Sequence, residues 1–381
     1  MTRFDPSAAV RAALRSMRGY VPIEPPEEVA ARYGVAPEAI LKLDGNENPY
    51  GPSPRALAAL AAPYAAHRYP DPDQRRLRTA LASHLGVPVA NVLAGAGSDE
   101  LIDLLFRAYV EPGDRIVVAP PTFGMYAFDA ELHGATVIEV PRGEGWALDA
   151  GALLEAASSA KVVFIPSPNN PTGDVLPSDL ADRLLDSGAL LVVDEAYIEF
   201  SHASSLAQRA ADGAPLVVLR TFSKWAGLAG LRVGYGVMPS EMVTLLLQIK
   251  QPYDLNVAAE VAALASLEDR ALLDERACAI TGTRDALAEA LRATGWIHPW
   301  PSESNFLLCR LDGALGLDVR EGLRRRGIFI RYFDSERLRD HVRISVGTPE
   351  DSTRLLEALA AVHSELDTVA TLPSEGRRPD R

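Results

Sequence analysis

Short apolar, β-rich runs separated by helix-length segments constrain this chain more than any other feature of its sequence. The runs that read as buried strands are Ile116–Ala119, Val162–Ile165, Leu190–Val193 and Leu216–Leu219. An apolar run of this length, bounded by turn signals, is typical of a strand covered on both faces of a parallel sheet. Their alternation with helical stretches predicts a doubly wound α/β domain, which binds ligands at the carboxyl ends of its strands.

The pattern changes near residue 267, and this change predicts a second domain. The segments that indicate it are a long helical stretch ending near Gly295, strands at Phe306–Arg310, Gly327–Arg331 and His341–Val346, a helix between the first two strands, and another helix after Pro349. We therefore predict an irregular, proline-bearing arm over residues 1–42, a large domain over 43–266 and a small α+β domain over 267–372. The charged tail, residues 373–381, is predicted to be disordered.

Size and charge exclude several classes of function. The chain has 381 residues, 48% of them hydrophobic, which is too long for one ordinary core. Its net charge of −13 argues against sequence-independent binding to nucleic acid, because the phosphate backbone would repel it. The apolar runs are too short for a membrane helix, and Met1–Met17 lacks the apolar core of a signal peptide. Cys278 and Cys309 lack metal-ligand or redox spacing, so we expect reduced, packed cysteines in a cytoplasmic protein and no metal site.

A glycine-containing motif, Gly95-Ala96-Gly97-Ser98-Asp99-Glu100, separates the short apolar piece Asn91–Ala94 from a helix predicted over Asp99–Val110. Glycines let the backbone approach a ligand closely, and a helix N-terminus presents free N–H groups to an anion. Ser98 is predicted to cap the helix. The motif would also suit an ordinary helix start. It is not the dinucleotide fingerprint, because no third glycine follows at the required place.

Two further motifs follow predicted strands of the large domain. The segment Ser167–Gly173 comes after the strand that ends at Ile165, and its prolines and glycine predict a rigid turn from which Asn170 can present its amide. Asp194 ends another strand, where a buried acid is costly unless it pairs with a cation, and the nearby Tyr197 could hydrogen-bond a phenolate-like oxygen. A plain turn would fit the first motif as well, and a metal or phosphoryl-transfer site would fit the second, although no Walker A loop accompanies it.

Lys224 follows a predicted strand and turn, among small and apolar residues. Such surroundings lower the pKa of an amine, which an imine-forming lysine requires. The hydroxyls of Thr221 and Ser223, together with Arg232 at the end of a glycine-rich run, form a donor set that suits a phosphate. Most lysines are solvated surface groups, but these neighbours favour a functional interpretation.

In their order along the chain, these motifs resemble those of fold-type I pyridoxal-phosphate (PLP) enzymes, and among them the class I and II aminotransferases. The resemblance covers residues 43–359 and implies a large doubly wound, mostly parallel-sheet domain with a smaller α+β C-terminal domain. It implies PLP as cofactor, with Lys224 holding it as a Schiff base and moving the proton. It also implies that Asp194 keeps the pyridine nitrogen protonated, and that Asn170 and Tyr197 bond the ring's 3-oxygen.

The same resemblance implies the remaining contacts of the cofactor. The residues it assigns to the phosphate, through backbone N–H groups or side chains, are Ser98, Asp99, Thr221, Ser223 and Arg232. Phe123 matches the aromatic residue that stacks on the ring. Tyr69 matches the tyrosine that reaches the phosphate of the neighbouring subunit, which implies a homodimer with shared active sites. Without the resemblance, Phe123 and Tyr69 would be interpreted as core or turn residues.

Further motifs are similar to the subgroup of this family that uses histidinol phosphate as amino donor. They are the segments Leu43–Gly51, Pro121–Tyr126, Asp194–Phe200 and Arg343–Thr348. In that subgroup two arginines, matching Arg331 and Arg343, bind the substrate's anionic group, and a tyrosine of the arm, matching Tyr20, helps hold the phosphate. Asn46 in the first motif is a further substrate-binding candidate. The implied reaction converts histidinol phosphate and 2-oxoglutarate into imidazole acetol phosphate and glutamate.

Several alternatives stay open at this point. The chain has Gly45 and Trp225 where relatives commonly have alanine, and similar enzymes use phenylalanine or tyrosine, or decarboxylate threonine phosphate. A PLP-binding regulatory module would need a fused DNA-binding domain, for which the arm is too short. A dehydrogenase would need the dinucleotide fingerprint that the sequence lacks.

Overall fold

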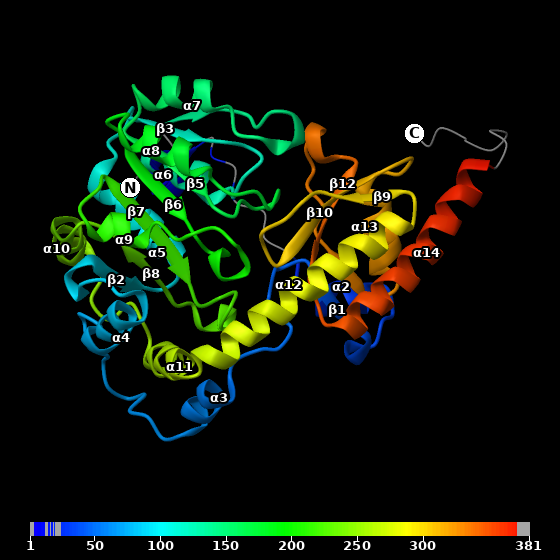
Figure 1. The fold of residues 1–381 in the computed structure, drawn as a ribbon, viewed down its shortest axis with the longest axis horizontal. Helices are drawn as coiled ribbons and strands as arrows, with labels where there is room; N and C mark the ends of the chain where they lie inside the picture. The colour runs from blue at the N-terminus through cyan, green and yellow to red at the C-terminus, as the bar shows by residue number, and fades with distance from the viewer. Residues whose placement is uncertain (1–3, 12–13, 16, 18, 20–23, 372–381) are drawn as a thin grey trace. The chain divides into compact units, whose positions relative to one another are not determined.

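A computed structural model describes residues 4–11, 14–15, 17, 19 and 24–371, which divide into two compact units (Figure 1). The large unit comprises Glu47–Thr281, Pro301–Asn305 and the described part of Met1–Pro22. The small unit comprises Gly282–Trp300 and the described parts of Ile23–Asn46 and Phe306–Arg381. The long helix α12 (Arg270–Ala293) runs through the division at Thr281. The sequence placed this boundary at 266/267, because a change of pattern marks where the helix begins and not where the units divide.

One sheet of seven strands lies at the centre of the described large unit, in the order β2-β8-β7-β6-β5-β3-β4. The strands are β2 (Val92–Gly95), β3 (Arg115–Val118), β4 (Thr136–Glu139), β5 (Val162–Pro166), β6 (Leu190–Asp194), β7 (Leu216–Thr221) and β8 (Gly234–Val237). The predicted apolar runs form β3, β5, β6 and β7, and the pairs β3–β5, β5–β6 and β6–β7 are parallel. β8 runs antiparallel to both neighbours. The prediction of a mostly parallel α/β sheet is therefore confirmed.

Helices cover both faces of this sheet. On one face α5 (Ser98–Tyr109), α6 (Met125–His133) and α10 (Ser240–Ile249) enclose a core that includes Val192 and Leu219. Side chains alternate along a strand, so the buried Leu191 and Val218 point to the opposite face. Three other helices also contact the sheet: α7 (Ala150–Ala157) contacts β3, α8 (Ser178–Leu185) contacts β6, and α9 (Ala207–Ala211) contacts β7. Further helices of this unit are α1 (Pro6–Ala9), α3 (Pro54–Ala61), α4 (Arg75–Leu85) and α11 (Val257–Glu268).

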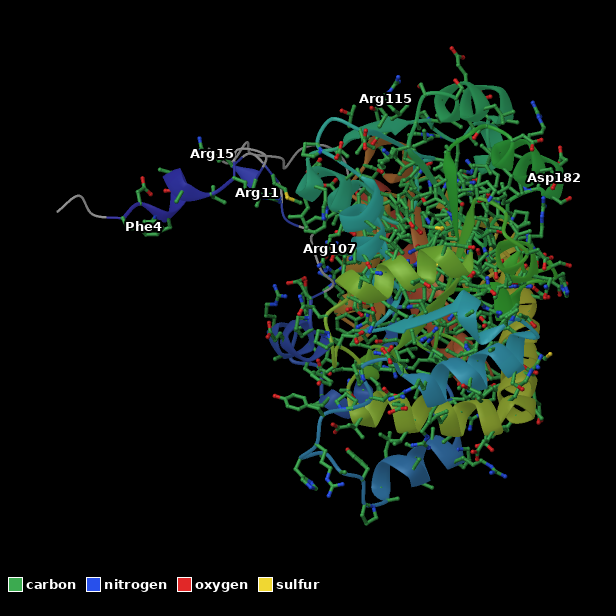
Figure 2. All side chains as sticks on the ribbon, turned by 90° about the vertical axis from the view of Figure 1, so that its left-hand side faces the viewer. Phe4, Arg11, Arg15, Arg107, Arg115 and Asp182 are labelled. Atoms are coloured by element: carbon green, nitrogen blue, oxygen red, sulfur yellow. The ribbon has the colours of Figure 1, made fainter. Side chains whose placement is uncertain are left out.

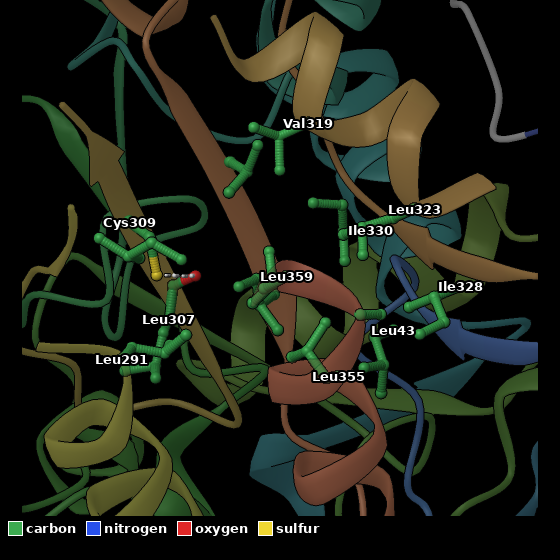
Figure 3. Packing of buried hydrophobic residues seen from close by; sticks show 14 of the residues in the cluster. Leu43, Leu291, Leu307, Cys309, Val319, Leu323, Ile328, Ile330, Leu355 and Leu359 are labelled. Carbon is green, nitrogen blue, oxygen red and sulfur yellow. Dashed lines mark hydrogen bonds between the residues drawn. The ribbon is translucent and has the colours of Figure 1, made fainter. Parts of the chain in front are cut away.

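The small unit combines an antiparallel sheet, β12-β10-β9, with a two-stranded parallel pair, β1-β11. Its elements are α2 (Pro26–Arg32), β1 (Leu41–Leu43), β9 (Ile297–Pro299), β10 (Phe306–Leu311), α13 (Gly316–Arg324), β11 (Ile328–Ile330), β12 (His341–Ser345) and α14 (Pro349–Thr371). Leu43, Leu307, Ile328 and Leu355 meet in its core (Figure 3). Residues 26–42, which lie in the arm that the sequence predicted to be irregular, thus contribute helix α2 and the first two residues of β1, because β1 forms only by pairing with the distant β11.

The structure also qualifies the expectations for smaller features. Cys309 is buried, but Cys278 on α12 is exposed, so the expectation that both are packed is wrong for Cys278. Tyr20 and residues 373–381 lie outside the described residues. Over the ranges given above, we find no helix long and apolar enough to span a bilayer. The same ranges contain no group of His, Cys, Asp or Glu side chains suited to holding a metal ion.

Candidate active site

The carboxyl ends of three parallel strands bring Asn170, Asp194 and Thr221 to one edge of the sheet. The strand register pairs Pro166 of β5 with Asp194 of β6, and Asp194 with Leu219 of β7. The Asn170 turn, Asp194 and Thr221 therefore leave the sheet at neighbouring positions, although they are far apart in the sequence. This is the edge where doubly wound folds bind ligands.

Asp194 is buried, with 6% of its surface exposed. Its carboxylate accepts hydrogen bonds from the Tyr126 hydroxyl at 2.8 Å and from the Ala196 N–H at 3.1 Å. Burial nevertheless raises the pKa of Asp194 to about 6, against the lowering effect of these bonds. A carboxylate held this way gains from a cationic partner. Tyr126 was not assigned a role from the sequence; the available signal was its place in the Pro121–Tyr126 motif.

A second cluster gathers donors suited to a phosphate. The Thr221 and Ser223 hydroxyls lie 2.9 Å apart, and the Arg232 guanidinium donates to Ser223 Oγ at 3.4 Å and to the Asp99 carboxylate at 2.9 Å. Helix α5 begins at Ser98, and its N-cap is Gly97, which has no side chain to cap it. The prediction that Ser98 caps the helix is therefore wrong. A helix start without a side-chain cap keeps its first N–H groups available for an anion.

Two glycines make the close packing of this cluster possible. A Cβ atom on Gly234 would lie 2.4 Å from the Ser98 nitrogen, and one on Gly97 would lie 2.7 Å from Arg232 Nη2. Gly97 also has φ of +86°, which L side chains rarely adopt. Glu100 supports the loop by accepting the Ala96 N–H at 2.6 Å, and burial raises its pKa to about 7. Neither Gly234 nor Glu100 was assigned from the sequence.

The lysine and its neighbours lie at the same edge. Lys224 is half-buried, and its Nζ lies 5.8 Å from the centre of the buried Tyr197 ring. Phe123 packs edge-on against Tyr126, with ring centres 5.6 Å apart, which links it to the Asp194 hydrogen bond. Asn170 is half-buried.

The adjacent Asn169, which the sequence did not single out, is fully buried and joins two loops of the site. It accepts a hydrogen bond from Thr122 at 2.8 Å and donates one to the Pro121 carbonyl at 3.0 Å. Asn169 thereby fixes the turn that carries Asn170 against the loop that carries Phe123. The described large-unit candidates other than Tyr69 thus belong to one strand-end region and the loops attached to it.

Tyr69 is placed differently. It is 82% exposed and stacks on the ring of Tyr253 at 4.6 Å, so it lies on the surface of the large unit. Tyr253 was not predicted, and its φ of +66° is uncommon for a residue with a side chain.

In the small unit, the structure places two predicted arginines directly opposite each other. Arg331 and Arg343 form an antiparallel bridge and exchange backbone hydrogen bonds of 3.0 and 2.8 Å. Both guanidiniums lie over the ring of Phe333, at 5.5 and 5.8 Å from its centre. Like charges directly opposite are destabilising in a sheet, and an anion held by both would relieve this repulsion.

Asn46 lies in the same unit and is almost fully buried. Its backbone N–H donates to the Ser345 hydroxyl at 2.8 Å, and that hydroxyl donates to the Asn46 side-chain oxygen at 2.9 Å. Arg343, two residues before Ser345, also donates to the Asp44 carbonyl. These bonds fix the segment that precedes the large unit to strand β12, and so hold Asn46 near Arg343.

Comparison with known proteins identifies the family of this chain. The sequence matches the class I and II aminotransferases over residues 38–359. It is 50% identical over 366 residues to a histidinol-phosphate aminotransferase of Roseiflexus castenholzii, covering 93% of this chain and 98% of the relative. A chloroplastic histidinol-phosphate aminotransferase of Nicotiana tabacum is 43% identical, over 94% of this chain and 87% of the relative.

A solved structure agrees with these relatives. The histidinol-phosphate aminotransferase of Sinorhizobium meliloti in complex with pyridoxal-5'-phosphate superposes with a TM-score of 0.85 at 28% identity, covering 96% of this chain and 99% of that one. Fold and sequence similarity thus lead to the same assignment. The chain belongs to the class I and II aminotransferase family, and within it to the histidinol-phosphate aminotransferases.

Proposed function

We propose that the chain transfers the amino group of histidinol phosphate to 2-oxoglutarate, with PLP as cofactor, and so yields imidazole acetol phosphate and glutamate. The observation that carries the substrate assignment is the opposed pair Arg331 and Arg343, whose guanidiniums share one aromatic ring. The names of relatives at 40–50% identity support the same donor. With both described cysteines free, we place the enzyme in the cytoplasm.

The residues of the large unit fit PLP. When bound, the cofactor supplies an aldehyde that can exchange amines and a protonated ring that withdraws electrons. Lys224 Nζ would hold the aldehyde and later carry the proton that leaves the donor's carbon. The buried Asp194 carboxylate would keep the ring nitrogen protonated, and the raised pKa of Asp194 reflects its need for such a cation.

The other predicted residues would orient the ring. Asn170 and Tyr197 are proposed to bond its 3-oxygen, and Phe123 is proposed to stack on its face. The phosphate would occupy the start of α5 and the donor cluster, formed by Ser98, Asp99, Thr221, Ser223 and Arg232. In this proposal the phosphate binds the Arg232 guanidinium, which also pairs with the Asp99 carboxylate.

On the substrate side, Arg331 and Arg343 would bind the phosphate of histidinol phosphate, with Asn46 and Tyr20 completing the substrate contacts. A dianionic phosphate can use two guanidinium groups, whereas the carboxylate of glutamate is satisfied by one. The arginine fork would therefore favour the phosphate donor over plain amino acids.

Replacing Arg331 with alanine is expected to lower kcat/KM for histidinol phosphate by roughly 10- to 200-fold, because a charge-assisted hydrogen bond contributes about 1.5–3 kcal/mol. The loss for glutamate should be clearly smaller. The measurement is steady-state kinetics with each donor separately. Replacing the exposed Arg325 of the same unit with alanine serves as a matched control, which should leave kcat/KM for both donors unchanged. Equal losses for both donors would remove the phosphate-specific role.

We also propose a homodimer in which the exposed Tyr69 reaches the partner subunit's cofactor phosphate. Mixing inactive Lys224→Ala with a weakened Tyr69→Phe should then restore activity, because each mixed dimer contains one site with both residues intact. The check is activity after subunit exchange, with each variant alone as control and the size of the particle measured in parallel. A fully active monomer at assay concentration would contradict the shared site.

The proposed function is tested by a panel of amino donors with 2-oxoglutarate as acceptor. Histidinol phosphate should give the highest kcat/KM, above phenylalanine and tyrosine, and threonine phosphate should release no CO₂. An enzyme that prefers phenylalanine would be an aromatic aminotransferase, and the phosphate role of Arg331 and Arg343 would then be lost while the cofactor chemistry stands.

A further inference from the structure

Three charged side chains lie behind the strand ends that carry the cofactor residues. Arg220 Nη2 donates to Glu199 Oε1 at 2.7 Å, and Arg220 Nε lies 4.0 Å from Glu195 Oε2. The side chains of Arg220, Glu195 and Glu199 are only 9%, 2% and 12% exposed. We call these three residues the Arg220 triad.

The triad is connected by sequence to the proposed active site but lies on the opposite face of the sheet. Glu195 follows Asp194, and Arg220 precedes Thr221, so strand alternation directs these neighbours to opposite faces. The bond from the Glu195 N–H to the Leu219 carbonyl, 2.8 Å, continues the β6–β7 ladder and brings Glu195 beside Arg220. Glu199 lies in the short helix Ile198–Phe200, immediately after Tyr197.

Glu195 and Arg220 each have further contacts that fix them. Glu195 accepts hydrogen bonds from the Leu206 N–H at 2.7 Å and the Ser205 hydroxyl at 2.6 Å, both at the start of α9. Arg220 lies over the ring of the buried Tyr235, 6.0 Å from its centre. The position of Arg220 between the two carboxylates is therefore determined from α9 and β8 as well as from its own strand.

The triad is a poor way to stabilise a fold. It buries two carboxylates against one guanidinium, and burial raises the pKa of both Glu195 and Glu199. A buried ion pair often contributes no more stability than apolar residues of similar size. Its value lies in geometry: the planar guanidinium donates to Glu199 in a fixed direction, whereas Glu195 attracts Arg220 by charge at 4.0 Å without a hydrogen bond. Here the partners are the chain segments next to Asp194 and Tyr197.

We propose that Arg220 is a positioning residue, which holds Glu195 and Glu199 and thereby fixes Asp194 and Tyr197 relative to the strand that leads to Lys224. The inference rests on the proposed function, because it assumes that Asp194 and Tyr197 contact the cofactor ring. Tyr197 depends most on the triad, since it ends no strand and precedes the helix that Glu199 anchors.

The test uses the holoenzyme with Glu199→Ala, which releases the Tyr197 side of the triad and also removes the excess buried charge. We expect kcat to fall about 10- to 100-fold, as for a small misplacement of a catalytic group, while KM for histidinol phosphate changes little. A hydroxyl bonded to the ring oxygen opposes protonation of the nearby cofactor–lysine linkage. Loosening Tyr197 should therefore raise the pH midpoint of the cofactor's visible absorbance by about 0.4–1 unit.

Companion variants separate positioning from stability. Glu199→Gln keeps an oxygen for Arg220 and should restore both kcat and the midpoint. Arg220→Lys keeps the charge but loses the fork, so it should raise the midpoint as Glu199→Ala does, and it replaces that variant if Glu199→Ala does not fold. The double variant Glu199→Ala/Arg220→Lys should have a kcat no lower than that of the poorer single variant, because both substitutions disrupt the same interaction.

Two controls define a purely structural effect. Leu180→Ala, at a buried position of α8, should lower the melting temperature and leave the midpoint unchanged. Arg209→Gln removes an arginine of α9 that pairs with the outward-pointing Asp182 (Figure 2). This variant should change neither the melting temperature nor the pH midpoint. A Glu199→Ala holoenzyme with normal kcat and midpoint would overturn the positioning role alone. Turnover by Lys224→Ala would instead overturn the proposed function.

Discussion

Replacing Lys224 with alanine is expected to abolish turnover. The lysine lies beside the buried Tyr197 ring at the strand-end site, and no other lysine in the sequence occupies a comparable strand-end motif. The substitution removes both the covalent attachment of the cofactor and the base that moves the proton. General acid–base catalysis alone contributes about 10²–10⁴-fold, so the combined loss should exceed roughly 10⁴-fold in kcat.

The measurement is turnover of histidinol phosphate after saturation with PLP, combined with mass spectrometry of protein treated with borohydride. Wild-type protein should retain the cofactor on the peptide that contains Lys224, and the variant should retain none. Cofactor binding to the variant should persist through the phosphate cluster, because Thr221, Ser223 and Arg232 are unchanged. Normal turnover in the variant, or attachment at another lysine, would contradict the assignment.

Replacing Asp194 with asparagine should cause the second largest loss. Asp194 is buried, and burial raises the pKa of its carboxyl to about 6. A cationic partner would therefore stabilise its negative charge. Breaking a buried ion pair by removing one partner costs about 3–5 kcal/mol. If that loss falls on the transition state, the rate should decrease by roughly 10²–10⁴-fold.

Tyr126→Phe is the matched control for Asp194→Asn. It removes the hydrogen bond of 2.8 Å to Asp194 but keeps the carboxylate, so its loss should be clearly smaller. The readouts are kcat and the visible spectrum of the bound cofactor. A loss below about tenfold for Asp194→Asn, corresponding to about 1.4 kcal/mol, would mean that this carboxylate does not hold the ring proton.

Features that depend on local patterns could be predicted from the sequence. The apolar runs of β3, β5, β6 and β7 are each long enough to indicate a buried strand, and parallel strands align their carboxyl ends. This is why Asp194, Thr221 and Lys224 could be expected at one edge from the sequence alone. The residue types at those strand ends then indicated the chemistry.

Features that arise only from tertiary packing could not be predicted. Tyr126 and Asp194 are separated by 68 positions, and nothing local in either segment indicates their hydrogen bond. The short strand β1 has too few residues for a periodic signal and forms by pairing with β11. The opposition of Arg331 and Arg343 depends on a strand register, which the sequence of either segment does not reveal.

The most direct test of the proposed reaction is a single turnover without acceptor. Holoenzyme mixed with histidinol phosphate alone should release imidazole acetol phosphate in an amount equal to its active sites, and later addition of 2-oxoglutarate should release an equal amount of glutamate. The two half-reactions follow from an amino group that is stored on the enzyme between substrates. Absence of the keto product, or glutamate formation only when phenylalanine or tyrosine replaces histidinol phosphate, would contradict the account.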